Sequence, residues 1–233
     1  MKMRFLVALT AAATAALGAV GSAGAAQDST CPGGTLSSGI YNNVSVTGTC
    51  TASGAVFIKG NLNVNGNSVF NAQFGGTING NVQAWNGSVL FLRDFDVTHS
   101  VSASGAQSVI LASNTLGQGV LIQGGGGAPA GACSRHDVPV TQQPIAEVFA
   151  NDVVGTVSIA GRGGCVNEIA NNAISGGVNF VNNQADVSGG FNGIFFNVIS
   201  GNLFCKNNSP HPSGNGTNSV GGTINFPGDC AVI

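Results

Sequence analysis

Asn172-Ala-Ile174-Ser-Gly176-Gly-Val178-Asn-Phe180 and Asn197-Val-Ile199-Ser-Gly201-Asn-Leu203-Phe-Cys205 are two copies of one sequence phrase. Counted from its Asn, the phrase has apolar residues at positions +2, +6 and +8 and Gly at +4. Its apolar residues alternate with small or polar ones, which is typical of a β-strand with one buried face. The phrase therefore predicts strands that line a core, and further copies can be sought elsewhere.

The phrase recurs along most of the chain. Further copies place its Gly position at Gly60, Gly80, His99, Gln118, Gly155 and Gly222, and the successive spacings of the whole series are 20, 19, 19, 37, 21, 25 and 21. A period of about 20 residues with Gly and Asn between strands fits a coil that returns to its start and stacks on the previous one. No segment has the periodicity of an amphipathic helix. We therefore predict an all-β solenoid of about eight coils, with parallel strands and a period of about 20 residues.

A second column of residues supports this period. It consists of Ser-Val pairs that recur once per coil: Ser68-Val69, Ser88-Val89 and Ser108-Val109. Each pair is followed by a large apolar residue: Phe70, Leu90 or Ile110. Neighbouring residues on a flat strand cannot both face the core. Either a coil corner lets both enter the core, which is the interpretation we favour, or an apolar stripe lies outside and marks a contact surface.

Residues 1–26 resemble a signal peptide. Lys2 and Arg4 precede an apolar run over residues 5–20, and Ala23-Gly24-Ala25 has the small residues of a cleavage site. Residues 27–233 are then a single domain, and no segment of this mature chain is apolar enough to span a membrane. We expect a secreted, extracellular protein, with attachment to the cell wall left open.

Charge argues against nucleic acid as a partner. Removing Lys2 and Arg4 leaves five of the seven basic residues against nine acidic ones, a net charge of about −4. Nucleic acid would require a basic stripe to offset its phosphates. Charged residues are only 7% of the chain, so Asn, Gly, Ser and Thr must cover most of the surface.

Six cysteines follow the expected signal peptide, at positions Cys31, Cys50, Cys133, Cys165, Cys205 and Cys230. An even number in an exported protein predicts three disulfides. Pairing of sequence neighbours (31 with 50, 133 with 165, 205 with 230) closes three local loops, although six cysteines allow about 15 pairings. Free buried thiols are the alternative, above all at Cys205, which occupies a core position of the repeat.

Three segments depart from the repeat. Residues 27–53 and 206–233 are expected to cap the two ends, because an open solenoid end exposes strand edges and core. Residues 123–146 contain a glycine run and prolines, which indicate a loop insertion anchored by Cys133 rather than a full coil. A degenerate coil in this place is the alternative.

The run Gly193-Ile194-Phe-Phe-Asn197-Val-Ile199-Ser-Gly201-Asn202 resembles the repeat of right-handed parallel β-helices of the pectate-lyase-like superfamily, including small exported bacterial members. The resemblance covers about residues 54–226. It implies a ladder of stacked side-chain amides at the turn, formed here by Asn114, Asn151, Asn172 and Asn197. In the earlier coils, Val56, Gly76 and Phe95 take that place. The superfamily includes polysaccharide lyases, hydrolases and adhesins, so the resemblance fixes no chemistry.

The densest polar cluster is formed by Arg93, Asp94, Asp96 and His99. A carboxylate pair beside a basic group could serve a polysaccharide lyase or hydrolase, where one group moves a proton and another stabilises developing charge. The alternative is structural: Asp94 lies one period before Asn114 and could hold the ladder position, with Arg93 as its surface partner. His99 could then hydrogen-bond Gln118 of the next coil.

Metal and cofactor signals are weak. His136 and Asp137, next to Arg135, could bind a metal, but the Cys and His spacing of a zinc site is missing, and a solvated loop is the better interpretation. The glycine run at 124–127 lacks the Lys and Ser/Thr of a phosphate-binding loop. No cofactor is therefore expected.

The outward face of the phrase, at positions +3, +5 and +7, is neutral. It carries amides, hydroxyls and glycines, and Lys59 is its one charged residue. Such a face can hydrogen-bond neutral glycans but supplies neither the acid and base nor the electrostatic stabilisation that cleavage requires. We therefore expect a non-catalytic protein with a structural, adhesive or glycan-contacting role outside the cell. The candidate partners are a wall glycan or further copies of the protein end to end.

Overall fold

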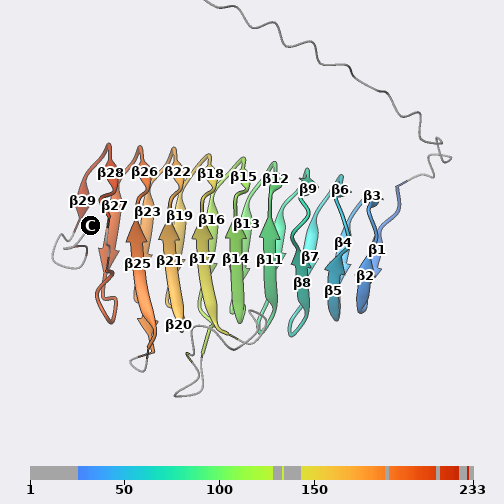
Figure 1. The fold of residues 1–233 in the computed structure, drawn as a ribbon, viewed down its shortest axis with the longest axis horizontal. Coiled ribbons are helices and arrows are strands. Elements are labelled where there is room, and N and C mark those ends of the chain that lie inside the picture. The colour runs from blue at the N-terminus through green and yellow to red at the C-terminus, as the bar shows by residue number, and fades with distance from the viewer. Residues whose placement is uncertain are drawn as a thin grey trace, which may run out of the picture.

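The computed structural model describes residues 26–127, 133, 143–186, 189–213, 216–225 and 230. Residues 1–25 of the expected signal peptide and the Arg135–Asp137 motif lie outside these residues. The described chain forms a parallel β-solenoid of about nine coils with a period of about 20 residues and no helix. Figure 1 shows the strands stacked along the long axis, from β1–β3 at one end to β28 and β29 at the other.

Three parallel sheets, here called A, B and C, form the sides of the solenoid. Sheet A consists of β1 (Ser29–Cys31), β4 (Val44–Val46), β7 (Leu62–Val64), β10 (Val82–Ala84), β13 (Val101–Ser104), β16 (Val120–Gln123), β19 (Val157–Ala160), β23 (Val178–Val181), β27 (Leu203–Lys206) and β29 (Ile224–Asn225). Sheet B consists of β2 (Gly34–Leu36), β5 (Thr49–Ala52), β8 (Val69–Ala72), β11 (Val89–Arg93), β14 (Ser108–Ala112), β17 (Ile145–Phe149), β21 (Val166–Ala170) and β25 (Phe191–Phe195).

Sheet C completes each coil. It consists of β3 (Gly39–Tyr41), β6 (Val56–Ile58), β9 (Gly76–Ile78), β12 (Phe95–Val97), β15 (Thr115–Leu116), β18 (Asp152–Val153), β22 (Ala173–Ile174), β26 (Val198–Ile199) and β28 (Ser219–Val220). A small two-stranded sheet pairs β20 (Gly163–Gly164) with β24 (Gln184–Ala185).

The predicted inward column of sheet A is confirmed. Val82 pairs with Leu62 on one side and Val101 on the other, and Val101 pairs with Val120. The column continues through Val157, Val178 and Leu203, and all of these side chains are buried. Parallel strands stack about 4.8 Å apart, so each coil buries its apolar residues against like residues of its neighbours. The core is this set of aliphatic stacks.

Residues 29–52, expected as part of an N-terminal cap, form strands in the same three sheets as the repeat. Their apolar residues continue the inward columns: Val44 pairs with Leu62, and Val46 pairs with Val64. This segment has no Asn-x-x-x-Gly phrase, yet its alternation of apolar and polar residues suffices to form strands. The solenoid therefore has about nine coils where eight were visible from the phrase.

The long gap between Gln118 and Gly155 contains no additional strand of sheet B among the described residues. Strand β14 pairs directly with β17, with Val109 opposite Ala146, and β15 pairs directly with β18. The chain therefore leaves the solenoid after β16 and resumes the next coil at Ile145. Most of the insertion expected at residues 123–146 lies outside the described residues.

The favoured interpretation of the Ser-Val column was wrong about the coil corner, although Val89 and Leu90 are both buried. Residues 69, 70, 89 and 90 lie within flat strands of sheet B and not at a corner. Phe70 and Leu90 face the core, whereas Val69 and Val89 face outward with Ile110. The coil that leads from β11 to β14 is one residue shorter than the coil that leads from β8 to β11. Val109 therefore pairs with Leu90, and Ser108 pairs with Val89. The side chains of Val69, Val89 and Ile110 therefore lie on the outer face of sheet B, but Val89 and Ile110 are only 3% and 6% exposed and do not form an exposed stripe.

Candidate functional site

The N-terminal coils carry an amide ladder where the chain turns from sheet C into sheet A. Oδ1 of Asn43 accepts the backbone N–H of Asn61 at 2.8 Å, and Oδ1 of Asn61 accepts that of Asn81 at 2.8 Å. Asn61 and Asn81 occupy the outward +5 position of the phrase, which the sequence analysis assigned to solvent. Their side chains instead satisfy backbone donors of the next coil, which the turn would otherwise leave unpaired.

This ladder ends in the middle of the solenoid. Ser100 takes the next position, and its hydroxyl donates to Oδ1 of Asn81 at 2.8 Å. The position after it is Gly119, followed by Thr156 and Gly177. A Cβ at Gly119 would lie 2.7 Å from the Thr156 carbonyl oxygen, so no side chain fits there without a backbone shift. The loss of the large amides opens a hollow on the outward face of sheet A.

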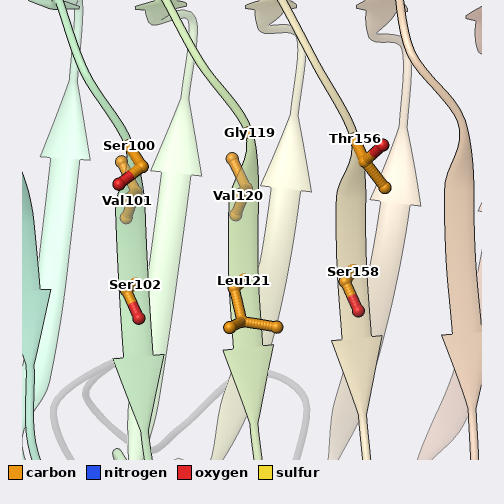
Figure 2. A pocket seen from close by; sticks show the side chains of 8 residues that line it. All are labelled: Ser100, Val101, Ser102, Gly119, Val120, Leu121, Thr156 and Ser158. Atoms are coloured by element: carbon orange, nitrogen blue, oxygen red, sulfur yellow. The ribbon is translucent and has the colours of Figure 1, made fainter.

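The hollow is an open groove of about 400 Å³ across β13, β16 and β19. Figure 2 shows its lining residues, which lie on these three neighbouring strands or directly before them: Ser100, Val101, Ser102, Gly119, Val120, Leu121, Thr156 and Ser158. Leu121 is 40% exposed, the largest side chain of the outward row between Ser102 and Ser158. The groove is therefore an apolar strip flanked by hydroxyl groups.

Three hydroxyl groups of the groove are available to a ligand. Those of Ser102, Thr156 and Ser158 make no hydrogen bond within the described part of the chain. A hydroxyl can donate one hydrogen bond and accept two. No lining residue is charged. The groove can thus hydrogen-bond a neutral polar ligand and cover its apolar side, but it holds no group that could move a proton.

The structure distributes the predicted polar cluster around the coil. Arg93 ends β11 of sheet B, Asp96 lies on the outward face of β12 of sheet C, and His99 lies beyond it where the chain turns into sheet A. All four side chains are exposed, and within the described ranges no hydrogen bond or ion pair joins them. They do not line the groove on sheet A.

Both structural interpretations of this cluster need correction. Asp94 does not hold the ladder position, because Phe95 occupies it and donates its N–H to Oδ1 of Asn114 at 2.9 Å. Asp94 is one residue earlier, with φ of 60°. His99 does not reach Gln118; its Nδ1 lies 2.7 Å from the Asn79 carbonyl oxygen on the preceding coil. A carbonyl only accepts, so Nδ1 carries the proton in this contact.

The four ladder asparagines are all buried where sheet B turns into sheet C. The side-chain oxygen of each later asparagine accepts the backbone N–H of the ladder residue one coil before it. The N–H of Asn114 donates to Oδ1 of Asn151 at 2.8 Å, that of Asn151 to Oδ1 of Asn172 at 2.8 Å, and that of Asn172 to Oδ1 of Asn197 at 3.0 Å. Their side-chain amides also bond to one another and to core-facing carbonyls, such as Nδ2 of Asn151 to Leu111 at 2.9 Å. Asn218 continues the ladder beyond Asn197. The buried amides of this turn are thereby paired within the protein.

A further ladder, which the sequence analysis missed, lies where sheet A turns into sheet B. Oδ1 of Asn208 accepts the N–H of Asn183 at 3.0 Å, and Oδ1 of Asn183 accepts the N–H of Arg162 at 3.1 Å. The pairs Asn182-Asn183 and Asn207-Asn208, one coil apart, were the available signal. In each pair the first residue has positive φ, a conformation that Asn tolerates better than most residues.

Arg162 takes the ladder position in the coil that follows the insertion. Its side chain is 1% exposed, and its guanidinium donates to the carbonyls of Ala106, Gly124 (2.8 Å), Gln107 (3.0 Å) and Ile145 (3.3 Å). Burial lowers the pKa of Arg162 to about 10, so the group is still a cation at neutral pH. It joins carbonyls on both sides of the insertion, where regular strand pairing is interrupted.

The structure pairs the cysteines as sequence neighbours: Cys31 with Cys50, Cys133 with Cys165 and Cys205 with Cys230. The first bond joins strands of sheets A and B in the first coils, and the last joins β27 to the segment beyond β29. Cys165 directly precedes β21, so the middle bond ties Cys133 of the insertion to the start of strand β21. Three disulfides are compatible with an extracellular protein.

A carboxylate pair on sheet B was also missed. Glu147 and Glu168 lie directly opposite each other on the outward faces of β17 and β21. Burial raises the pKa of Glu147, and nearby Arg93 lowers it to a smaller extent. Both residues lie outside the Asn-Gly phrase, which carries no information on the register of sheet B. Their proximity was therefore hidden.

Within the described ranges, no three His, Cys, Asp or Glu side chains lie close enough together to hold a metal ion. None of the described segments forms a helix of the length and apolarity that crossing a membrane requires.

Comparison with known proteins identifies no relative: no family model, curated protein or solved structure matches the chain. The parallel solenoid is established by the pairing of its strands. Membership of the pectate-lyase-like superfamily remains a prediction from the repeat phrase.

Proposed function

We propose that this is an exported, non-catalytic β-solenoid that contacts neutral glycans outside the cell through the groove on sheet A. The observation that supports it best is the composition of the groove. It combines three unpaired hydroxyls with an exposed leucine and carries no charge. A sugar ring has the complementary surface, because its hydroxyls lie at its edge and its C–H groups on its faces.

Rigidity favours binding at this place. The lining residues lie on three consecutive strands of one sheet, so their spacing is fixed by the backbone pairing at about 4.8 Å per coil. A rigid, preformed surface binds a regular polymer with little loss of conformational entropy. The proposed affinity is modest, since neutral hydrogen bonds exposed to water contribute little each.

Polysaccharide cleavage is the second candidate, and one observation favours it. Glu147 and Glu168 are neighbouring carboxylates, and the raised pKa of Glu147 is the property of a general acid. Paired carboxylates about 5 Å apart are the arrangement of retaining glycosidases. The pair lies on sheet B, away from the groove.

One experiment separates the two functions. The mature protein is incubated with laminarin, galactomannan and polygalacturonate, and binding is followed by calorimetry while new reducing or unsaturated ends are assayed. We expect binding to a neutral polysaccharide and no new ends. Appearance of new ends that is lost in Glu147→Gln would refute the non-catalytic function.

The groove is tested with a pair of matched variants. Ser158→Trp fills the groove from β19, whereas Asn63→Trp places the same ring in the same outward row on β7, outside it. We expect the first variant to reduce the affinity for the neutral polysaccharide at least about tenfold. Equal binding by both variants would place the binding surface elsewhere.

A further inference from the structure

Trp85, the only tryptophan of the chain, lies on the outward face of sheet A near the groove. It directly follows β10, in which Val82 and Ala84 face the core, so alternation along the strand points its side chain outward. Its backbone N–H donates to the Val64 carbonyl oxygen of the preceding coil at 3.0 Å, which extends the pairing of sheet A to this residue. Trp85 therefore shares its face with the outward residues of the groove.

The indole of Trp85 is held in place and is accessible to a ligand. Its carbonyl oxygen accepts the N–H of Ser88 at 2.9 Å, which closes a tight turn and fixes the backbone. The residue is 46% exposed, and within the described ranges its indole N–H makes no hydrogen bond. An indole combines a large apolar face with one hydrogen-bond donor, so it suits a partner that is apolar on one side and polar at its edge.

The surface between Trp85 and the groove is polar and uncharged. Gln83 lies opposite Ser102, and Ser104 lies opposite Gln123 on the next strand. None of these four side chains makes a hydrogen bond in the part of the chain that the structure describes. Amides and hydroxyls can each donate and accept hydrogen bonds. A band of unpaired neutral groups thus connects the indole to the groove.

The two apolar ends of this surface are far enough apart to select for a chain. Trp85 follows β10 and Leu121 lies on β16, with β13 between these two strands. The two side chains are therefore about 10 Å apart along the solenoid axis and about 7 Å apart along the strands. A single sugar ring is too small to cover both, whereas an oligosaccharide can contact both ends and hydrogen-bond the residues between them.

We propose that Trp85 forms a second binding subsite, where its indole stacks on one sugar ring of a neutral glycan chain that also contacts Leu121 in the groove. This inference rests on the proposed function of the groove and specifies its ligand as a chain of several uncharged sugars that crosses β16, β13 and β10. The C–H face of one sugar packs on the indole, and the hydroxyls along the chain meet Gln83, Ser102, Ser104 and Gln123.

The fluorescence of the protein tests this contact directly, because Trp85 is its only tryptophan. The mature protein is titrated with laminarin and with galactomannan, and emission and heat of binding are recorded together. For a polysaccharide that binds, the emission maximum is expected to shift to shorter wavelength, with the same midpoint as the calorimetric isotherm. Binding without a change in emission would overturn the Trp85 subsite and leave the function of the groove intact. Absence of binding to any neutral polysaccharide would refute the function of the groove and this inference with it.

Trp85→Ala and Phe74→Ala form a matched pair of variants. Phe74 is also an exposed aromatic residue, 65% accessible, but lies between β8 and β9, outside sheet A. Trp85→Ala is expected to lower the affinity for the bound polysaccharide at least about fivefold, whereas Trp85→Tyr keeps an aromatic face and most of the affinity. Phe74→Ala is expected to bind as the wild type does, with thermal unfolding confirming that all three variants fold. Wild-type affinity in Trp85→Ala would overturn the subsite.

The length of the ligand tests the span between the two ends. In the wild type, the affinity is expected to rise at least about tenfold from the disaccharide to the hexasaccharide of the bound polysaccharide, because only the longer chain reaches both ends. In Trp85→Ala the same lengthening is expected to raise the affinity less than about threefold. An equal gain in both proteins would contradict a chain that spans the groove and Trp85.

Discussion

Sheets A and B have equivalent inward faces and opposite outward faces. Inside, both present columns of aliphatic residues in register, such as Val82, Val101 and Val120 in sheet A. Outside, sheet A carries hydroxyls and amides around a neutral groove, whereas sheet B carries phenylalanines and a carboxylate pair. Since the inward columns suffice to stack the coils, the outward residues are free to differ, and that difference is where function is to be sought.

The strongest test of this division uses neighbouring residues of one strand. Val120 faces the core and is 2% exposed, whereas Leu121 faces the groove. Val120→Asp buries a carboxylate without a partner and is expected to destabilise the protein by more than about 4 kcal/mol, so that it does not fold. Leu121→Asp is expected to change the free energy of unfolding by less than about 1 kcal/mol and to weaken glycan binding. Chemical denaturation followed by circular dichroism measures both; similar losses in both variants would contradict the assigned strand faces.

The second test concerns the corner where sheets A and B meet. Arg162→Met removes the donor of four carbonyls and is expected to lower the free energy of unfolding by about 3 kcal/mol, because those acceptors stay buried. The matched control is Lys59→Met, which removes an exposed cation and is expected to have little effect. Urea unfolding of both variants is the measurement, and an equal effect would show that Arg162 is not required at this corner.

The third test concerns a charged residue on the outward face of sheet B, a kind of residue that the groove on sheet A lacks. Glu147 faces Glu168 on β21 and Ile110 on β14, with Arg93 on β11 as the nearby cation. Because its pKa is raised in the folded protein, its contribution to stability is present below the ordinary pKa of a glutamate and is lost as the pH rises through the raised value. Glu147→Gln is therefore expected to stabilise the protein at neutral pH by up to about 1 kcal/mol and not at acidic pH. Thermal unfolding across this pH range checks it; a benefit that grows toward acidic pH would contradict the sign.

The smallest expected effect lies at a corner residue that belongs to neither face. Ala150 precedes a ladder asparagine and has φ of 56°, a conformation that costs a residue with a Cβ. Ala150→Gly removes that cost and adds backbone entropy to the unfolded chain, so a net gain of about 0.5 kcal/mol is expected. The control, Ala160→Gly in β19, is expected to destabilise by a similar amount. Calorimetric melting temperatures distinguish the two variants. A loss of stability in both would contradict the cost assigned to the positive φ of Ala150.

The sequence was informative about sheet A and about the turn into sheet C. The phrase runs through the last residues of sheet C and into sheet A, so its period aligned Val82 with Val101 and Val120 correctly. It also placed Asn114, Asn151, Asn172 and Asn197 at equivalent positions. These features repeat because each coil must satisfy the same backbone donors at the same turn.

Sheet B could not be read in the same way. Coil lengths change between the strands of sheet B, so that Val109 shifted by one residue against its expected column. A shift of one residue moves each side chain to the opposite face. The sequence therefore predicted neither the pairing of Glu147 with Glu168 nor the outward position of Val69 and Val89.

The groove was missed for a different reason. The groove lies where the amide ladder of Asn43, Asn61 and Asn81 is not continued, because Gly119 has no side chain. The sequence analysis treated these amides as a solvent-facing surface. The role of the missing side chain became visible only when the bonds of its neighbours were known.

The most direct test of the central claim is a titration of the labelled protein with an oligosaccharide of the bound neutral polysaccharide, followed by backbone amide chemical shifts. The predicted result is a set of shift changes confined to sheet A, centred on Ser102, Leu121 and Ser158, with Glu147 and Phe149 of sheet B unchanged. Shift changes centred on sheet B would contradict the assignment of the groove as the ligand face.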